Sequence, residues 1–127
     1  MNPRGLLLFF YFVVFNLPVS GQWNQLKFRQ LGANDGLSGS LVQSIYEDNQ
    51  GFMWFGTREG LCKYDGYTFT IFKRSLHNKN TISWNNVMAV QQDRNKLLWI
   101  ATTEGGVNVL DLNKDQFQEV NDLLPPG

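Results

Sequence analysis

The chain has 127 residues, with eleven basic and eleven acidic side chains that cancel to a formal net charge of zero. This length allows at most one ordinary domain, and the balanced charge gives no electrostatic reason to expect binding to nucleic acid or to an anionic membrane. Aromatic residues make up 14% of the chain beside 12 glycines, which favours many short strands joined by tight turns. The single cysteine, Cys62, can form no internal disulfide and excludes a metal site built on paired cysteines.

The first 21 residues have the three-part organisation of a secretory signal peptide. Arg4 precedes an almost wholly apolar run from Gly5 to Leu17, and the small residues of Pro18-Val19-Ser20-Gly21 follow. The run is shorter than the ~20 apolar residues of a membrane-spanning helix. We therefore expect cleavage after Gly21 and export of residues 22–127, with an uncleaved membrane anchor as the alternative.

The sequence predicts a lone outer strand from Leu26 to Leu31, followed by a loop from Gly32 to Gly36. In many β-propellers such a strand pairs into the last blade and closes the ring. Without that blade the strand would leave an unpaired edge, which invites aggregation.

Residues 37–72 and 82–120 are two copies of one pattern. A period of this size, made of short apolar runs and turn residues, predicts one propeller blade per copy. The matching pairs are 45 positions apart up to Thr102 and 46 apart after one inserted residue: Ser38 and Ser83, Val42 and Val87, Ile45 and Val90, Asp48 and Asp93, Trp54 and Trp99, Thr57 and Thr102, Leu61 and Val107, Asp65 and Asp111.

The first copy predicts four strands separated by turn residues. The strand from Phe52 to Thr57 is apolar on both faces, as expected between two neighbouring blades. The four predicted strands are Leu41 to Glu47, Phe52 to Thr57, Leu61 to Asp65 and Tyr67 to Phe72.

The second copy repeats this order after a polar connector, Lys73 to Asn86. Lys96 stands where the first copy has Gly51, and we expect Asn95 to supply the left-handed backbone position of that turn. The predicted strands are Val87 to Gln92, Leu97 to Thr102, Val107 to Leu112 and Phe117 to Val120.

The expected fold is therefore all-β. We predict an incomplete β-propeller with two four-stranded blades, about 41–72 and 87–120, and the N-terminal strand of a closing blade. Two blades cannot close a ring, so we expect the chain to be the start of a longer protein, and alone to be marginally stable or to aggregate.

The residues of the first copy resemble the two-component regulator propeller repeat. The resemblance rests on Gly36-Leu37-Ser38, the Val42, Ile45 and Asp48 spacing, Gly51 to Thr57, Gly60-Leu61, Tyr64-Asp65-Gly66, and Phe69 with Phe72. The connector residues Asn80-Thr81-Ile82-Ser83 also resemble the stretch that opens the second blade in these proteins. The second copy departs from the pattern at Ala101 and Leu110, which replace Gly56 and Tyr64.

This resemblance implies the N-terminal periplasmic sensor of a hybrid two-component system, of the kind best known from Bacteroidetes. Similar proteins carry two seven-bladed propellers, a β-sandwich, a transmembrane helix, a histidine kinase, a receiver and a DNA-binding module, and many sense glycans. The implied function is extracytoplasmic sensing of an oligosaccharide, with a homodimeric parent protein in the inner membrane. The kinase is absent from this chain, so we expect no enzyme activity here.

Two alternatives stay open: a secreted propeller binding protein without a kinase, and a propeller glycosidase or lyase fragment. The spacing Asp48-x-x-Gly51-x-x-Trp54 resembles the Asp-box of sialidase-type propellers, although that motif has one residue fewer between Asp and Gly. Glycoside hydrolysis needs a positioned carboxylate pair or a tyrosine nucleophile with an acid. Asp48 and Asp93 occupy equivalent turns, so we expect them to hold hairpins.

The sequence predicts no catalytic, cofactor-binding or metal-binding residue. Trp23 and Trp84 lie outside the predicted strands and are the candidates for stacking against a sugar, while Trp54 and Trp99 are expected to pack between blades. His77 is the sole histidine and is expected to be a solvated loop residue. Cys62 lies in a predicted strand and is expected to be a small buried hydrophobe.

Overall fold

The computed structural model describes residues 27–118 and 120–123. The predicted signal peptide, its cleavage after Gly21 and the candidate Trp23 lie outside the described residues. The described elements are the short 3-10 helices η1 (Ala33–Asp35) and η2 (Val120–Leu123) and eight strands: β1 (Val42–Glu47), β2 (Met53–Thr57), β3 (Gly60–Tyr64), β4 (Phe69–Phe72), β5 (Val87–Gln92), β6 (Leu97–Thr102), β7 (Val107–Asp111) and β8 (Gln116–Gln118).

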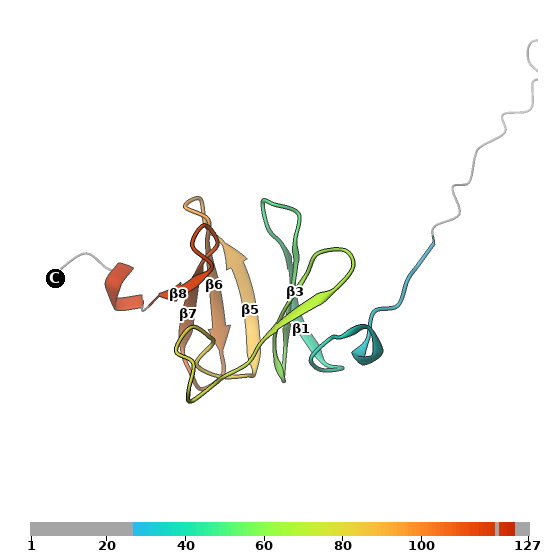
Figure 1. Cartoon of the computed structure of the whole chain (residues 1–127), viewed down its shortest axis with the longest axis horizontal. Helices are drawn as coiled ribbons and strands as arrows, with labels where there is room; N and C mark the ends of the chain where they lie inside the picture. The colour runs from blue at the N-terminus through green and yellow to red at the C-terminus, as the bar shows by residue number, and fades with distance from the viewer. Residues whose placement is uncertain (1–26, 119, 124–127) are drawn as a thin grey trace, which may run out of the picture.

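The strands form two four-stranded antiparallel sheets, each in simple meander order. The first sheet is β1-β2-β3-β4 and the second is β5-β6-β7-β8, and they lie side by side as two blades (Figure 1). Strand β5 of the second blade contacts both β1 and β2 of the first. The prediction of an all-β propeller fold with two four-stranded blades is confirmed.

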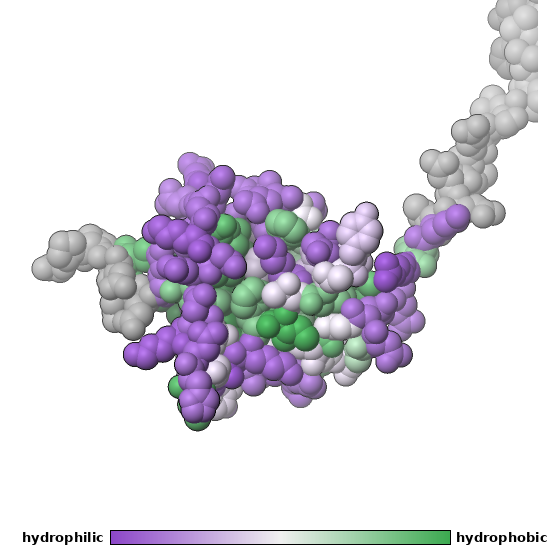
Figure 2. All heavy atoms as spheres, viewed as in Figure 1, coloured by the Kyte–Doolittle hydropathy of each residue, from purple (hydrophilic) through white to green (hydrophobic). Residues whose placement is uncertain are grey.

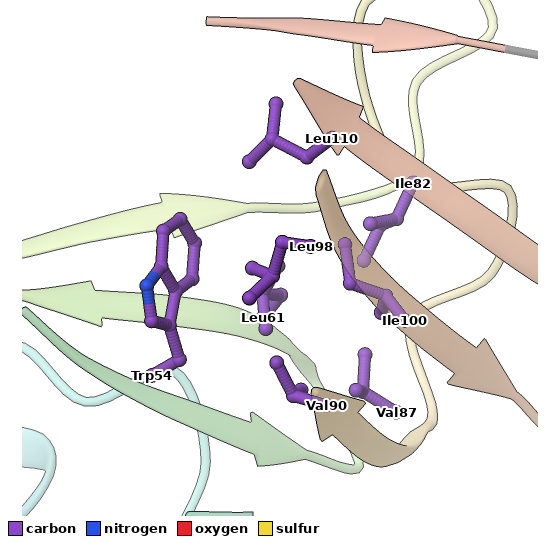
Figure 3. Close-up of a cluster of buried hydrophobic side chains, with 8 residues drawn as sticks. All are labelled: Trp54, Leu61, Ile82, Val87, Val90, Leu98, Ile100 and Leu110. Carbon is purple, nitrogen blue, oxygen red and sulfur yellow. The ribbon is translucent and has the colours of Figure 1, made fainter. Parts of the chain in front are cut away.

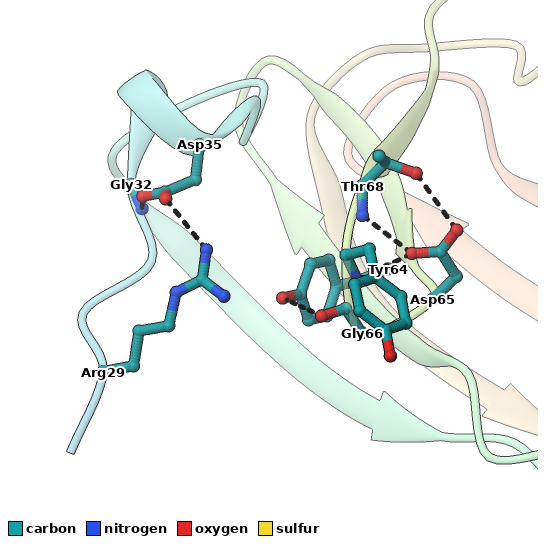
Figure 4. Close-up of polar contacts among 8 residues, drawn as sticks. Arg29, Gly32, Asp35, Tyr64, Asp65, Gly66 and Thr68 are labelled. Carbon is teal, nitrogen blue, oxygen red and sulfur yellow. Dashed lines mark hydrogen bonds and ion pairs between the residues drawn. The ribbon is translucent and has the colours of Figure 1, made fainter. Parts of the chain in front are cut away.

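The predicted strand limits differ from the observed ones mainly next to the turns. Strands β5 and β6 have the predicted limits, whereas β4 begins only at Phe69 because Tyr67 and Thr68 belong to the preceding turn. There the carboxylate of Asp65 accepts hydrogen bonds from the backbone N–H of Tyr67 at 2.8 Å and of Thr68 at 2.7 Å (Figure 4). Because the Asp65 side chain holds Tyr67 and Thr68 in the turn, the strand begins two residues later than predicted.

The predicted N-terminal strand is not formed in residues 27–31. A β-strand is stable only with a partner strand, and this segment is held instead by local polar contacts. Asp35 forms an ion pair with Arg29 at 3.3 Å and accepts a hydrogen bond from the backbone N–H of Gly32 at 3.0 Å (Figure 4).

The expectation for Asn95 is wrong, because Lys96 itself takes the left-handed conformation, with φ 64° against 87° for its counterpart Gly51. The turn is closed by hydrogen bonds to Asp93, from the backbone N–H of Lys96 to its carbonyl oxygen and from that of Asn95 to its carboxylate. These contacts hold the backbone in the geometry that glycine supplies in the first blade, although a side chain disfavours it.

The hydrophobic core lies between the two blades (Figure 3). Trp54 and Leu61 come from the first blade, and both are fully buried. They meet side chains of the connector and of the second blade: Ile82, Val87, Val90, Leu98, Ile100 and Leu110. The core of the chain is therefore an interface between blades, and neither blade encloses a core of its own.

The two repeated tryptophans have different environments. Trp54 faces the second blade and is fully buried, which confirms its predicted packing between blades. In the second blade Leu98 and Ile100 face the first, so the alternation of side chains along β6 directs Trp99 to the opposite side. Trp99 is accordingly only partly buried.

Candidate functional site

The carboxylate of Asp48 holds the turn between β1 and β2. It accepts hydrogen bonds from the backbone N–H of Gln50 at 2.9 Å, the backbone N–H of Phe52 at 3.0 Å and the indole Nε1 of Trp54 at 2.8 Å. The hairpin role predicted for this residue is confirmed. The bond to the indole was not predicted, although an aspartate six residues before a tryptophan in both copies was a usable signal.

Asp93 makes the same three contacts in the second blade. Its carboxylate accepts from the backbone N–H of Asn95 at 2.8 Å, from that of Leu97 at 3.0 Å and from the indole of Trp99 at 3.0 Å. The indole bond is the main reason why the pKa of Asp93 lies below its ordinary value, and the two backbone bonds lower it further. A carboxyl with a lowered pKa stays ionised near neutral pH and is poorly suited to act as a general acid.

The third turn of each blade, between β3 and β4 and between β7 and β8, also uses an aspartate. The backbone N–H groups of Thr68 and then Tyr67 lower the pKa of Asp65. For Asp111, burial opposes ionisation, but hydrogen bonds from the backbone of Asn113 and Lys114 lower the pKa overall. These carboxylates serve the turns, so they provide no pair that is free for acid and base catalysis.

The connector between the blades is fixed by its own polar side chains. The backbone N–H of Arg74 donates to Oδ1 of Asn85 at 2.7 Å, and Oγ1 of Thr81 donates to the carbonyl of Lys73 at 2.6 Å. Asn80 ties the connector to the second blade, because its Oδ1 accepts from the backbone N–H of Phe117 at 2.7 Å. A polar segment without regular secondary structure is thereby held in a defined conformation over the second blade.

Trp84 lies on this connector and is partly buried. The guanidinium carbon of Arg74 lies 4.7 Å from its ring centroid, within range of a cation–π contact. The preceding residue is fixed as well, since the backbone N–H of Ser83 donates to Oδ1 of Asn108 and its hydroxyl donates to the carbonyl of Gly105. Of the two tryptophans predicted as sugar platforms, this is the one within the described residues.

Arg74 also borders a shallow groove between the connector and the second blade. The groove has a volume of about 710 Å³ and is lined mainly by polar residues, among them Arg74, Ser75, Asn78, Ser83, Asn108 and Gln118. The buried Nδ2 of Asn108 has no hydrogen-bond partner. The Trp84 and Arg74 pair and this groove together form the candidate binding site.

The other predicted side chains lie elsewhere. His77 is exposed on the connector, where its backbone N–H donates to the hydroxyl of Ser75, and the prediction of a loop residue is confirmed. Cys62 is fully buried, as predicted, and its thiol contacts the hydroxyl of Ser38 at 3.0 Å. Within residues 27–118 and 120–123 no group of three or more His, Cys, Asp or Glu side chains is placed to hold a metal ion.

Two meander blades with an apolar interface and aspartates that hold the turns define a β-propeller segment. A family model described as "Two component regulator propeller" matches residues 36–59 and 81–104, one match in each blade. Both blades therefore match this repeat, and the resemblance seen in the sequence is confirmed.

Two similar proteins extend this assignment. The chain is 34% identical over 83 residues to the histidine kinase P4 of Formosa agariphila, an alignment that covers 65% of this chain and 6% of that protein. The structure of this chain is similar to that of the extracellular domain of the hybrid two component system BT3049 from B. thetaiotaomicron, with 36% identity and a TM-score of 0.67. That match covers 71% of this chain and 13% of the other. The chain thus spans a small part of the length of both relatives.

The second of these relatives is the extracellular part of its own protein. Among the described residues, no helix is both long enough and apolar enough to cross a membrane.

Proposed function

We propose that the chain supplies two blades of the extracytoplasmic, periplasmic sensor propeller of a hybrid two-component signal transduction protein. The matched repeat in both blades supports this proposal, as do the likeness to an extracellular domain of such a system and to a histidine kinase. In this proposal the kinase belongs to the remainder of the sensor, which sits in the inner membrane as a homodimer. The propeller segment itself contacts no nucleic acid.

The ligand proposed is an oligosaccharide. The observation that carries this is the partly exposed indole of Trp84, which contacts the guanidinium of Arg74, and Arg74 in turn lines a polar groove. Sugars offer an apolar ring face, which packs on an indole, and hydroxyls, which bond to polar side chains. The amide of Asn78 and the hydroxyl of Ser75 line the groove beside Arg74.

The proposed signal is a change in geometry. A sugar bound at the connector contacts both the segment that leaves β4 and the turn between β6 and β7, so it favours one relative position of the two blades. Ligand binding shifts a conformational equilibrium only by its difference in affinity for the two states. In the homodimeric sensor this shift would bias the distant kinase.

The test is calorimetric titration of the full chain with a panel of defined plant and algal oligosaccharides. We expect at least one to bind, the Trp84→Ala variant to lose that binding, and the urea unfolding midpoint of the variant to stay close to that of the unaltered chain. Tyr67→Ala is the matched control, since Tyr67 is an 87% exposed aromatic residue that does not line the groove. Binding by none of the panel, or equal binding by Trp84→Ala, would contradict the oligosaccharide site.

A further inference from the structure

The connector between the blades, residues 73–86, carries basic side chains and no acidic ones. Three of the eleven basic residues of the chain lie on it, Lys73, Arg74 and Lys79, and all three are exposed. None of the eleven acidic residues lies on it, so the zero net charge of the whole chain does not apply to this segment. The connector includes the yellow loop at the lower left of Figure 1, and the surface there is mostly hydrophilic in Figure 2.

Two of these cations, Arg74 and Lys79, line the groove between the connector and the second blade. No Asp or Glu side chain of the described residues is among those that line it. Within residues 27–118 and 120–123, no salt bridge joins either cation to a carboxylate. Two cations without a neutralising partner in one concave surface attract anions from solution.

Arg74 is held in place before any ligand arrives. Its backbone N–H donates to Oδ1 of Asn85 at 2.7 Å, and its guanidinium carbon lies 4.7 Å from the ring centroid of Trp84. A guanidinium held over a ring face keeps the N–H donors at its edge available for a paired contact with two oxygens of an oxyanion. Because this position is fixed in advance, an anion that binds here orders less of the protein.

The neighbouring polar residues of the groove add further donors. Oγ of Ser75 accepts hydrogen bonds from the backbone N–H of His77 at 3.2 Å and of Asn78 at 3.1 Å. Oδ1 of Asn78 accepts one from the backbone N–H of Asn80 at 2.9 Å. These bonds engage the acceptor oxygens of two groove residues, which leaves the hydroxyl hydrogen of Ser75 and the amide N–H groups of Asn78 to face a ligand. From Arg74 to Lys79 the groove therefore offers donors.

Other lining residues offer acceptors instead. Oγ1 of Thr81 donates to the carbonyl of Lys73 at 2.6 Å, and Nε2 of Gln118 donates to Oδ2 of Asp111 at 3.1 Å. Both side chains thus use a donor within the protein and keep an oxygen that can accept a hydrogen bond from a sugar hydroxyl. The groove combines a cationic, donor-bearing stretch with acceptors for hydroxyl groups.

On the basis of the sugar-binding function proposed above, we propose that this groove selects an acidic oligosaccharide. A carboxylate or sulfate group on a sugar ring pairs with Arg74 and Lys79, and hydroxyls of the ligand donate to Thr81 and Gln118. The chemistry shared by the two kinds of acidic sugar is an oxyanion fixed to a ring that also carries hydroxyls. A neutral oligosaccharide would leave both cations without a counter-charge, so it binds more weakly.

The test is calorimetric titration of the full chain with three groups of defined oligosaccharides: neutral, uronate-containing and sulfated. We expect the binders to be acidic. Each binder is then compared with its own neutralised form, the methyl ester of a uronate or the desulfated form of a sulfated sugar. Neutralisation should weaken binding by roughly tenfold or more, and it identifies which oxyanion the groove takes. Raising NaCl from about 50 mM to about 500 mM should weaken the acidic ligand more than its neutral form, because salt screens exposed charges.

Substitutions assign the effect to the groove. Lys79→Gln and Arg74→Gln should each weaken the acidic ligand by roughly tenfold, whereas Lys79→Arg keeps the charge and should restore most of the affinity. Lys79 is exposed, so its replacement leaves the packed interface between the blades untouched. Arg94→Gln is the matched control: Arg94 is exposed in the turn between β5 and β6, does not line the groove, and its loss changes the net charge by the same amount.

The outcomes separate this proposal from the sugar-binding function itself. A neutral oligosaccharide that binds as tightly as its acidic analogue, and is lost in Trp84→Ala, would overturn the selection of acidic ligands while the sugar site stands. An equal loss of affinity in Arg94→Gln and Lys79→Gln would also overturn it, because the effect would then belong to net charge rather than to the groove. Binding by none of the three groups would contradict both proposals.

Discussion

The indole Nε1 of Trp54 donates a buried hydrogen bond of 2.8 Å to Oδ2 of Asp48, six residues earlier in the chain. The carboxylate is anchored to the turn between β1 and β2, and the indole ring lies in the core between the blades. The bond therefore links the local geometry of a hairpin to the packing of one blade on the next. Asp93 and Trp99 repeat it at 3.0 Å.

Removing the carboxylate of Asp48 should destabilise the chain. Asp48→Ala leaves the buried indole N–H and two turn N–H groups without their acceptor, and we expect a loss of about 1–3 kcal/mol in the free energy of unfolding. Asp93→Ala should cost less, because its indole partner is only partly buried and can be reached by water. Urea unfolding monitored by tryptophan fluorescence measures both. Equal losses for the two variants would contradict the role assigned to burial.

Truncating the two tryptophans should also destabilise the chain unequally, with the larger loss in the first blade. Trp54→Ala empties a fully buried position between the blades and should cost about 3–5 kcal/mol, which is enough to unfold a chain of marginal stability. Trp99→Ala removes a partly buried ring on the side of β6 that faces away from the first blade, and it should cost clearly less. Circular dichroism during thermal unfolding is the measurement, and Trp54→Phe is the conservative control. A larger loss of stability for Trp99→Ala than for Trp54→Ala would contradict the assignment of Trp54, rather than Trp99, to the interface between the blades.

Much of this fold could be predicted because the sequence contains two copies of the repeat, and equivalent strands can be aligned by comparing them. Matching the two copies locates the turns, and alternation within each strand indicates burial, as for Trp54. Which of the two faces of a blade is covered is decided by the neighbour, and Trp99 shows that an identical residue at an equivalent position differs in exposure for that reason. The N-terminal segment was predicted from its apolar pattern alone, but a strand also requires a partner.

The candidate site was less predictable. Trp84 could be singled out because it lies outside the strands, but its contact with Arg74 joins residues near the two ends of a polar connector. That connector folds through hydrogen bonds such as those of Asn80 and Asn85, which have no periodic signature in the sequence. Lys96 shows the same limit on a smaller scale, since the contacts of Asp93, rather than the intrinsic preference of the residue, determine its backbone conformation.

Stability should fall in acid partly through Asp93. Its pKa in the folded chain lies below the ordinary value of 3.8, mainly because the indole of Trp99 donates to the ionised carboxylate. The folded state thus binds the proton less readily than the unfolded state, so this stabilisation is present above pH 3.8 and is lost as the pH falls through the folded pKa. We expect Asp93→Asn to flatten the decline of the melting temperature between about pH 4 and pH 2.5. A decline as steep as that of the unaltered chain would contradict this role of Asp93.

The packing of the two blades should be sensitive to a single methyl group added at Gly56. A Cβ there would lie 2.8 Å from Cγ1 and 3.1 Å from the carbonyl oxygen of Val87, and would also collide with Oγ of Ser44. Real Cβ atoms do not approach this closely, so Gly56→Ala must push the second blade outward, and we expect a loss of about 1–3 kcal/mol in the free energy of unfolding. At the equivalent position the second blade already carries Ala101, which faces away from the first blade. Ala101→Gly should therefore cost no more than about 1 kcal/mol, the ordinary penalty for glycine within a strand.

A double-mutant cycle can separate how much Ser44 and Val87 each contribute to the loss of stability in Gly56→Ala. Oγ of Ser44 is buried without a hydrogen-bond partner, so Ser44→Ala alone should be neutral or slightly stabilising. It also removes one of the atoms that a methyl group at Gly56 would meet, while Val87 stays in place. The double variant should accordingly recover part, but not all, of the loss seen for Gly56→Ala, with a coupling energy that urea unfolding resolves. If the two changes are strictly additive, the methyl group does not meet Ser44. If Gly56→Ala has no effect at all, the two blades do not pack as closely as the structure has them.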